Sequence, residues 1–279
     1  MKYKIGFIGS GNMATAMLGG ILHSNLVQPE QIILSNPSQL KVDKLIQKYG
    51  VQGTISNRDV ASSVEILILA VKPNLFPQII NEIKNSVNES TIIVSIAAGQ
   101  TIEMIENSFE KSIKLVRTMP NTPALVGEGM SAIMPNKQIN EQELVKVIEI
   151  FNSFGQTEIV PESLVDAVVA VSGSSPAYVY VMIEAMADAA VLQGMSRQMA
   201  YQFASQAVLG AAKMVLETGI HPGILKDQVC SPGGTTIEAI ISLEKSGFRG
   251  DLMNAMESCS KKSKEMAKNE TNFNENYKK

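Results

Sequence analysis

The chain has 279 residues, which is about two domains' worth of sequence at roughly 150 residues per domain. Hydrophobic residues make up 45% and charged residues 18%, a globular composition that excludes a largely disordered chain. The net charge of −3 and the pI of about 5.6 provide no basic field, so we expect no nucleic-acid partner.

The cysteine and histidine content indicates an intracellular protein without a metal site. Two cysteines, Cys230 and Cys259, are too few for a disulfide framework, so a reducing cytoplasm is expected. The two histidines and two cysteines are scattered, and we expect no metal cluster. The apolar run Ile5–Ile8 is shorter than the roughly 7–15 apolar residues of a signal peptide, so no export is expected.

From residue 1 to about 160, short apolar runs alternate with amphipathic segments. The apolar runs predict strands of a parallel sheet covered on both faces. They are Ile5–Ile8, Ile32–Leu34, Ile66–Val71, Ile92–Ile96 and Leu115–Thr118. One helical face is formed by Met13, Met17, Leu18, Ile21 and Leu22, and another by Leu75, Ile79, Ile80 and Ile83. The alternation predicts an α/β fold, with a doubly wound Rossmann-type sheet over residues 1–160.

Residues 161–279 have a different texture, without a convincing strand after residue 162. Ser175 and Pro176 resemble an N-cap and a first-turn proline, opening a helix that runs to about Gln193. The remaining expectations are a helix from Ser196 to about Thr218, a connector at Gly219–Gly223, a helix at Thr236–Lys245, a helix from Gly250, and a fraying helix or loose tail at 261–279. We therefore predict an all-α second domain.

The stretch Leu164–Leu192 is the most apolar part of the chain. Charged residues and Pro176 interrupt it, whereas a bilayer span needs roughly 20 apolar residues, so we expect buried helices and no membrane. Helices that are apolar on most faces must be covered, and about 115 residues offer little room for this. A subunit interface is therefore expected, because obligate interfaces resemble a domain core cut in half.

A glycine-rich loop follows the first predicted strand. Gly9-Ser10-Gly11-Asn12-Met13-Ala14 fits the pattern G-x-G-x-x-G/A between a strand and a helix. In such a loop Gly9 permits the tight turn, Gly11 lets the backbone approach a pyrophosphate, and Ala14 allows close packing of helix and strand. The exposed amides and the helix dipole then hold the anion. The alternative is an ordinary glycine turn.

The end of the second predicted strand indicates a preference for NADP(H), with NAD(H) possible. NAD sites usually carry an acid about 20 residues after the glycines, yet no Asp or Glu lies between Gln31 and Val42. Ser35, Asn36 and Ser38 are donors for a ribose 2′-phosphate, and Lys41 is a candidate counter-charge. The alternative for Lys41 is an ordinary surface lysine.

A second glycine-rich turn lies at residues 229–238, with the sequence VCSPGGTTIE. Free amides and two hydroxyls at such a turn suit a carboxylate or another small anion. The alternative is that Thr235 or Thr236 simply caps the helix that follows.

These motifs together resemble the pyrroline-5-carboxylate reductase family. The similarity runs in order over about residues 3–265, and the motif SPGGTT is its most specific part. It is carried by Ile5–Ala14 (IGFIGSGNMA), Ala70–Pro73 (AVKP), Ala97–Gly99 (AAG), Met119–Pro123 (MPNTP), Ser172–Tyr178 (SGSSPAY) and Leu225–Glu238 (LKDQVCSPGGTTIE). The resemblance implies reduction of a cyclic imine carboxylate to L-proline with NAD(P)H. It also implies a Rossmann domain and a helical domain that dimerises, often with further assembly into decamers.

The resemblance assigns expected contacts to both ligands. The cofactor residues are Gly9, Ser10, Gly11, Asn12, Met13, Ser35, Asn36, Asn57, Ala70, Val71, Lys72, Pro73 and Ala98. The substrate residues are Ser231, Gly233, Gly234, Thr235 and Thr236. Imine reduction also calls for a hydrogen bond to the ring nitrogen, and our candidate for this catalytic contact is Thr236. Two positions depart from the family pattern. Ser175 stands where a second glycine is common, and Pro37 stands where many bacterial members carry arginine.

Two other functions fit parts of the pattern. A β-hydroxyacid dehydrogenase of the hydroxyisobutyrate type shares the two-domain plan but uses a lysine soon after a glycine turn in the second domain. After Gly173 this chain has no lysine before Lys213, which argues against alcohol oxidation. A non-catalytic NADP sensor is the other alternative, and the intact SPGGTT motif argues against it.

Overall fold

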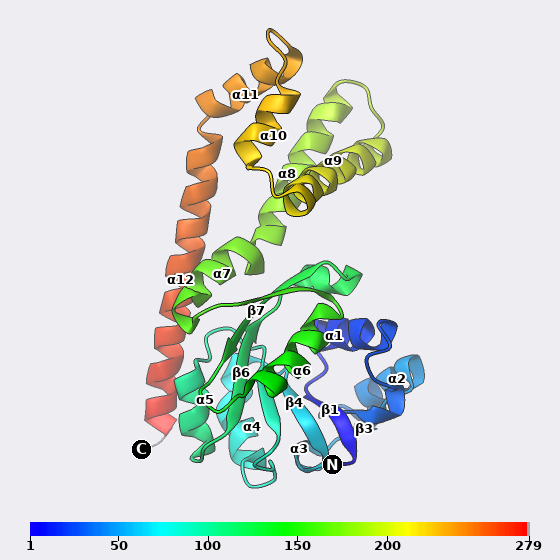
Figure 1. The fold of residues 1–279 in the computed structure, drawn as a ribbon, viewed down its shortest axis with the longest axis vertical. Helices are drawn as coiled ribbons and strands as arrows, with labels where there is room; N and C mark the ends of the chain where they lie inside the picture. The colour runs from blue at the N-terminus through cyan, green and yellow to red at the C-terminus, as the bar shows by residue number, and fades with distance from the viewer. Residues whose placement is uncertain (278–279) are drawn as a thin grey trace. The chain divides into compact units, whose positions relative to one another are not determined.

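The computed structural model describes the backbone of residues 1–277 and the side chains of residues 1–267. It forms two compact units (Figure 1). One comprises Met1–Gly173 together with the segment from Cys259 onward, and the other comprises Ser174–Ser258. The division differs from the boundary expected at residue 160, because the segment that leaves the sheet domain packs within that domain up to Gly173.

The first unit is built on one eight-stranded sheet with the order β3-β2-β1-β4-β5-β6-β7-β8. All neighbouring strands are parallel except β6 and β7, which are antiparallel. The strands are β1 (Tyr3–Ile8), β2 (Ile32–Ser35), β3 (Gln52–Thr54), β4 (Val64–Leu69), β5 (Ile92–Ser95), β6 (Lys114–Met119), β7 (Gly129–Pro135) and β8 (Gly155–Ile159). The first six follow the doubly wound order of dinucleotide-binding domains.

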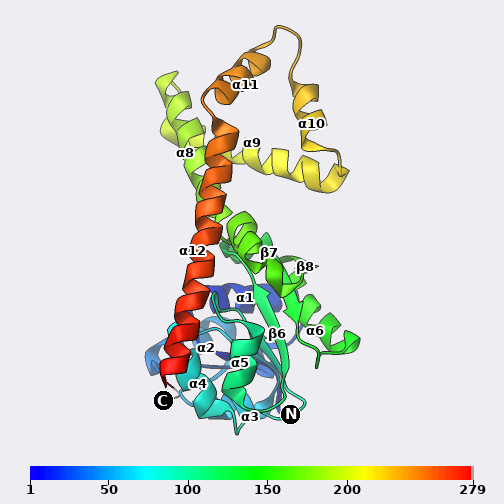
Figure 2. The same cartoon turned by 90° about the vertical axis from the view of Figure 1, so that its left-hand side faces the viewer.

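Six helices cover the two faces of this sheet. They are α1 (Asn12–His23), α2 (Gln39–Tyr49), α3 (Asn57–Ser63), α4 (Phe76–Ile83), α5 (Ile102–Phe109) and α6 (Glu141–Asn152). Buried residues of α1, α2 and α6 share one core cluster, and those of α3, α4 and α5 share the other. Figure 2 shows α4 and α5 on the near side of the unit and α1 and α2 behind the sheet. The doubly wound fold is therefore confirmed.

The five predicted strands are all present, whereas β3, β7 and β8 were not predicted. The strand β3 has only three residues, Gln-Gly-Thr, and β8 is a partly exposed edge strand with the polar sequence Gly-Gln-Thr-Glu-Ile. Neither carries the apolar run that reveals a buried strand. The expected helix end at Gly50 is confirmed, since Gly50 is a C-cap with φ of 72°.

The second unit is helical throughout. It contains α8 (Ser175–Leu192), α9 (Arg197–Thr218), α10 (Pro222–Val229), α11 (Thr235–Lys245) and the start of α12 (Phe248–Tyr277). As predicted, Ser196 precedes α9 and no strand occurs between residues 162 and 277. The N-cap of α8 is Ser174, one residue before the predicted cap, and Pro176 lies in the first turn.

One prediction for this half was wrong, and another had two alternatives that the structure decides. The connector expected at Gly219–Gly223 is shorter, because Pro222 begins α10, with His221 as its N-cap. His221 Nδ1 accepts the Gly223 amide at 3.0 Å, and this cap makes a short helix possible. Of the two alternatives for 261–279, the structure has the helix, because α12 continues to Tyr277, and residues 278–279 lie outside the described part.

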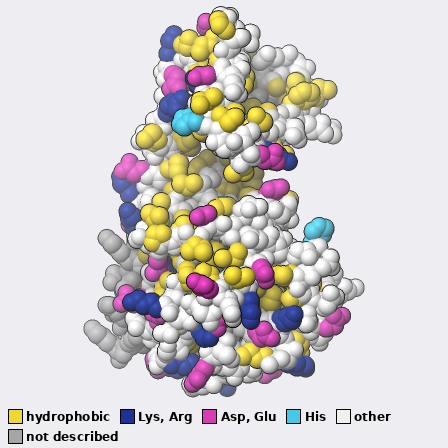
Figure 3. Space-filling view, in the orientation of Figure 1, with side chains coloured by type: hydrophobic (Ala, Val, Ile, Leu, Met, Phe, Trp, Pro, Cys, Tyr) yellow, Lys and Arg dark blue, Asp and Glu magenta, His cyan; other side chains and the backbone are white. Residues whose placement is uncertain are grey.

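The helical unit exposes much apolar surface, as the yellow side chains in Figure 3 show. Exposed large side chains include Tyr180, Val181, Phe203, Leu209 and Leu216, the last at 83%. By length and hydropathy, one helical stretch of the described residues, Glu162–Leu192, is apolar enough to cross a membrane, and only 6% of its apolar window is buried. Within one copy the described residues leave these faces exposed, which is what the predicted subunit interface requires.

Candidate cofactor and substrate sites

The glycine loop joins β1 to α1 in the conformation that a pyrophosphate cradle requires. Gly9 has φ of +97°, and a Cβ built there would lie 2.5 Å from the Ala70 carbonyl oxygen, so glycine is required. Gly11 is the N-cap of α1, and a Cβ built there would meet nothing within 4 Å. No side chain caps α1. The first amides of the helix, beginning at Asn12 and Met13, therefore face outward toward an anion.

A hydrogen-bonded pair connects this loop with the end of β2. Asn36 Nδ2 donates to Ser10 Oγ at 2.8 Å, while Asn36 Oδ1 accepts the Ser38 amide at 2.9 Å. The second bond forms a turn across Pro37. Because Ser10 Oγ accepts from Asn36, the hydroxyl hydrogen of Ser10 remains available to a phosphate oxygen. Asn36 therefore orients Ser10 as a donor.

A second relay starts at Ser35, which ends β2 and is fully buried at 0% exposure. Ser35 Oγ donates to Asn57 Oδ1 at 2.7 Å, and Asn57 Nδ2 donates to Glu82 Oε2 at 2.9 Å. Asn57 opens α3 and is only half-buried, so it reaches solvent where Ser35 does not. Sequence reasoning missed Glu82, because a carboxylate on α4 carries no motif that links it to β2.

The ends of β4 and β5 border the same edge of the sheet. The Ala70 amide donates to the Ile8 carbonyl at 2.8 Å, which places the Ala70–Pro73 loop beside the glycine loop. Lys72 is exposed there, and Ala98 is half-buried in the loop after β5. The structure thus brings the predicted cofactor residues to one edge of the sheet, as expected for ligands of parallel α/β sheets.

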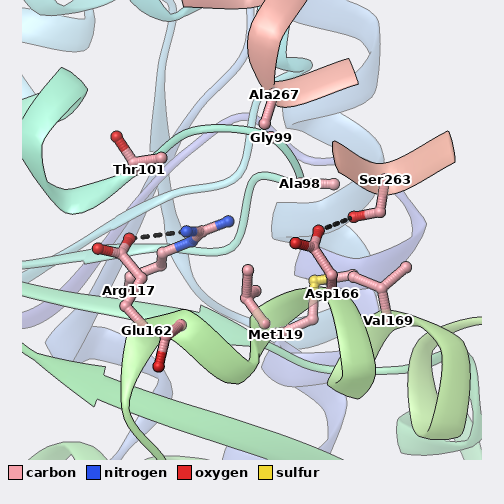
Figure 4. Close-up of a pocket in the computed structure, with 12 residues that line it drawn as sticks. Ala98, Gly99, Thr101, Arg117, Met119, Glu162, Asp166, Val169, Ser263 and Ala267 are labelled. Carbon is pink, nitrogen blue, oxygen red and sulfur yellow. Dashed lines mark hydrogen bonds and ion pairs between the residues drawn. The ribbon is translucent and has the colours of Figure 1, made fainter. Parts of the chain in front are cut away.

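A cavity of about 250 Å³ lies next to the Ala98 loop, within the first unit (Figure 4). Its base is the ion pair between Arg117 on β6 and Glu162, with Arg117 Nη1 2.7 Å from Glu162 Oε1. The same Glu162 oxygen accepts the Ile102 amide, at the start of α5, at 2.8 Å. On another wall, Ser263 donates to Asp166 Oδ1 at 2.7 Å. Glu162 therefore ties β6 and α5 to the chain segment leaving the sheet.

In the second unit, the predicted substrate loop is a tight turn before α11. The Gly234 amide donates to the Ser231 carbonyl at 3.0 Å, and Gly233 has φ of +67°, which is a glycine conformation. A Cβ on Gly234 would lie 2.3 Å from Ser231 Oγ and 3.1 Å from the Ser231 carbonyl oxygen, so a larger residue here would displace the Ser231 side chain. Gly234 is the N-cap of α11, and no side chain caps the helix.

The interpretation of Thr235 or Thr236 as a simple N-cap is wrong, because both are helical residues that follow Gly234. Their hydroxyls are therefore not used as caps. On α10, Lys226 pairs with Asp227 at 2.7 Å, and this hydrogen bond raises the pKa of Lys226. Among the described residues, no group of three His, Cys, Asp or Glu side chains is placed to hold a metal ion.

Known proteins resemble both units. A family model described as pyrroline-5-carboxylate reductase dimerisation matches residues 162–266, and one described as NADP oxidoreductase coenzyme F420-dependent matches residues 4–99. The pyrroline-5-carboxylate reductase of Escherichia coli strain K12 is 50% identical over 268 residues, covering 96% of this chain and 100% of that protein. The chain belongs to the pyrroline-5-carboxylate reductase family.

Other members of the pyrroline-5-carboxylate reductase family are also similar to this chain along nearly its whole length. The reductase of Methanosarcina acetivorans is 44% identical, covering 95% of this chain and 98% of that protein. The crystal structure of the Plasmodium falciparum reductase with NADP bound superposes with a TM-score of 0.86 at 35% identity, covering 96% and 99% of the two chains. The Coxiella burnetii reductase superposes at 0.89 and 34% identity, covering 95% and 99%. Membership argues against the hydroxyisobutyrate alternative and confirms a helical dimerisation domain.

Proposed function

We propose that this chain reduces L-1-pyrroline-5-carboxylate to L-proline, the final step of proline biosynthesis, with NADPH preferred and NADH also accepted. The observation that carries this proposal is 50% identity to a pyrroline-5-carboxylate reductase along nearly the whole chain. The geometry supports it independently, because one unit offers a dinucleotide cradle and the other an uncapped helix start that suits a carboxylate.

The cradle fits a dinucleotide. Gly9 forms the turn, Gly11 leaves open space for close approach, and Ser10 presents a donor. The amides of Asn12 and Met13 would hold the pyrophosphate, while Asn36 and Asn57 would contact the adenosine ribose. Ser35 would act through Asn57, because its own surface is buried. The remaining contacts come from the loops Ala70–Pro73 and Ala98. When bound, NADPH supplies the hydride that the imine carbon accepts.

The turn before α11 would hold the substrate. The amides at the start of α11, next to Gly233 and Gly234, would bind the carboxylate with Ser231 and Thr235. The Thr236 hydroxyl would bond to the ring nitrogen and fix the orientation of the C=N bond, and such positioning supplies much of the barrier reduction in reactions of bound pairs. A cyclic imine takes its proton from solvent, so no strong acid is needed in this site.

Replacing Thr236 by valine is expected to lower kcat by about tenfold or more while NADPH binding is retained, because the shape is kept and one transition-state contact is lost. Steady-state kinetics and NADPH titration check both parts. Thr236→Ser is the matched control, since it keeps the hydroxyl and should retain most of the activity. Unchanged kcat in Thr236→Val would exclude this role.

The direct test of the proposed function follows NADPH and NADH absorbance with purified protein and racemic pyrroline-5-carboxylate. We expect turnover with proline as the product, at a higher kcat/KM with NADPH. Tight dinucleotide binding without turnover would instead support the NADP sensor.

We infer that a second copy covers the exposed faces of α8 and α9, since the matching family model describes dimerisation. The basic unit is a homodimer, and we propose that dimers assemble further into a decamer, which sedimentation velocity measures directly. We also place the enzyme in the cytoplasm, in keeping with Cys230 and Cys259 not being joined in a disulfide.

A further inference from the structure

The residue that ends β2 marks the position at which a doubly wound domain recognises the ribose 2′ group of its dinucleotide. Here that residue is Ser35, and it is fully buried. Its hydroxyl bonds to Asn57, which is half-buried and reaches the surface at this point. Since the Ser35 side chain itself is buried, Asn57 is the group through which it can reach a ligand here, beside Asn36, and the orientation of the Asn57 amide decides whether it donates or accepts.

Glu82 determines that orientation. A carboxylate only accepts hydrogen bonds, so Asn57 must turn its NH₂ group toward Glu82 Oε2, at 2.9 Å. Asn57 Oδ1 then faces Ser35, whose hydroxyl must donate to it, at 2.7 Å. A flipped Asn57 would place two acceptors against each other at Glu82. The donor and the acceptor of each hydrogen bond in the chain Glu82–Asn57–Ser35 are consequently fixed.

We propose that Glu82 is a specificity-determining residue that favours NADPH over NADH by holding the Asn57 NH₂ group toward the ribose 2′ position. One Asn57 N–H hydrogen is used by Glu82, and the second is left for the ligand. A 2′-phosphate accepts but does not donate, so it needs this donor, whereas a 2′-hydroxyl tolerates either orientation. This inference rests on the proposed function in taking a dinucleotide as the ligand.

Glu82→Gln is the variant that tests the relay. A glutamine amide donates as readily as it accepts, so Asn57 is free to flip and the donor is no longer held in place. The Arg58 side chain, whose Nε donates to the Glu82 backbone carbonyl at 3.2 Å, keeps this partner in the variant. The matched control is Glu110→Gln, which removes a carboxylate paired with Lys84, the residue that follows α4.

Isothermal titration calorimetry measures the binding of adenosine 2′,5′-bisphosphate and of 5′-AMP to the wild-type protein and to both variants. A salt concentration of about 0.3 M screens the effect of remote charges. Glu82→Gln should weaken bisphosphate binding by about three- to tenfold and leave 5′-AMP binding within about twofold. This is less than the full effect of one charge-assisted hydrogen bond, because Asn57 keeps part of its population in the donating orientation. Glu110→Gln should change neither. The titration needs no turnover, so a failed reductase assay and a failed relay are separate results.

A double variant distinguishes the donor orientation of residue 57 from a merely structural role of its hydrogen bonds. Asn57→Asp with Glu82→Gln keeps the net charge and both hydrogen bonds, since the introduced glutamine donates to the new carboxylate, yet it presents only acceptors at position 57. We expect its thermal stability to match the wild type and its bisphosphate binding to fall below that of Glu82→Gln. Restored bisphosphate binding would overturn the proposal. So would equal loss of both nucleotides in Glu82→Gln, tighter bisphosphate binding, or a wild type that binds the two equally.

Discussion

Replacing Glu162 by leucine is expected to lower the free energy of unfolding by about 3 kcal/mol. The Arg117 side chain is 4% exposed, and Glu162 is its ion-pair partner at 2.7 Å. Without the carboxylate, a buried guanidinium is left uncompensated, and the Ile102 amide also loses its acceptor. Urea denaturation at fixed protein concentration measures the change.

Two controls accompany this variant. Glu217→Gln breaks the exposed pair between Lys213 and Glu217 and should change stability by less than about 0.5 kcal/mol. Adding Arg117→Met to Glu162→Leu removes both charges and should recover at least about 1 kcal/mol of the loss. A double variant no more stable than Glu162→Leu would show that the pair is not the source of the effect.

Replacing Gly9 by alanine is expected to cost about 3 kcal/mol of stability and to abolish NADPH binding. The backbone at Gly9 has φ of +97°, where an L-residue is strained, and the new methyl group would lie 2.5 Å from the Ala70 carbonyl oxygen. Either the loop or the end of β4 must move, and both border the cofactor edge. Thermal melts and fluorescence titration with NADPH measure the two effects.

Gly11→Ala is the matched comparison, because it adds the same methyl group two residues away. Its backbone φ is −74°, and the new Cβ would meet nothing within 4 Å. Stability should stay within about 1 kcal/mol of the wild type, while NADPH affinity falls by about tenfold or more because the methyl group fills the space left for the pyrophosphate. If Gly11→Ala binds NADPH as tightly as the wild type, the pyrophosphate does not lie against Gly11.

Periodicity and motif context were enough to predict the central sheet and the main helices. Both faces of the sheet are covered, so its inner strands are apolar, and this pattern can be read from the sequence. These strands are β1, β2, β4, β5 and β6. The edge strands β3 and β8 are held by backbone pairing with one neighbour and need no apolar run. The sequence after residue 261 left a helix and a tail as alternatives, because its polar composition fits both, and the structure has the helix.

The site was predicted in part, for a comparable reason. Glycines and strand ends are local signals, so the cradle at Gly9 and the turn at Gly233 were visible in the sequence. The partners Glu82 and Glu162 act over 25 and 45 residues of separation on Asn57 and Arg117, and no local pattern encodes such pairs. The burial of the Ser35 side chain was not visible from its position in the sequence, because burial depends on residues far along the chain.

The burial pattern of the helical unit couples its folding to the association of two chains. Within Ser174–Ser258, the fully buried residues are three alanines, Ala187, Ala200 and Ala204, which supply far less apolar contact than a self-sufficient core. We therefore expect folding of this unit to draw on association, so that its apparent free energy of unfolding varies with the logarithm of the chain concentration. Dilution is then expected to destabilise the half of the molecule that carries the SPGGTT turn more than the sheet domain, which has two cores of its own.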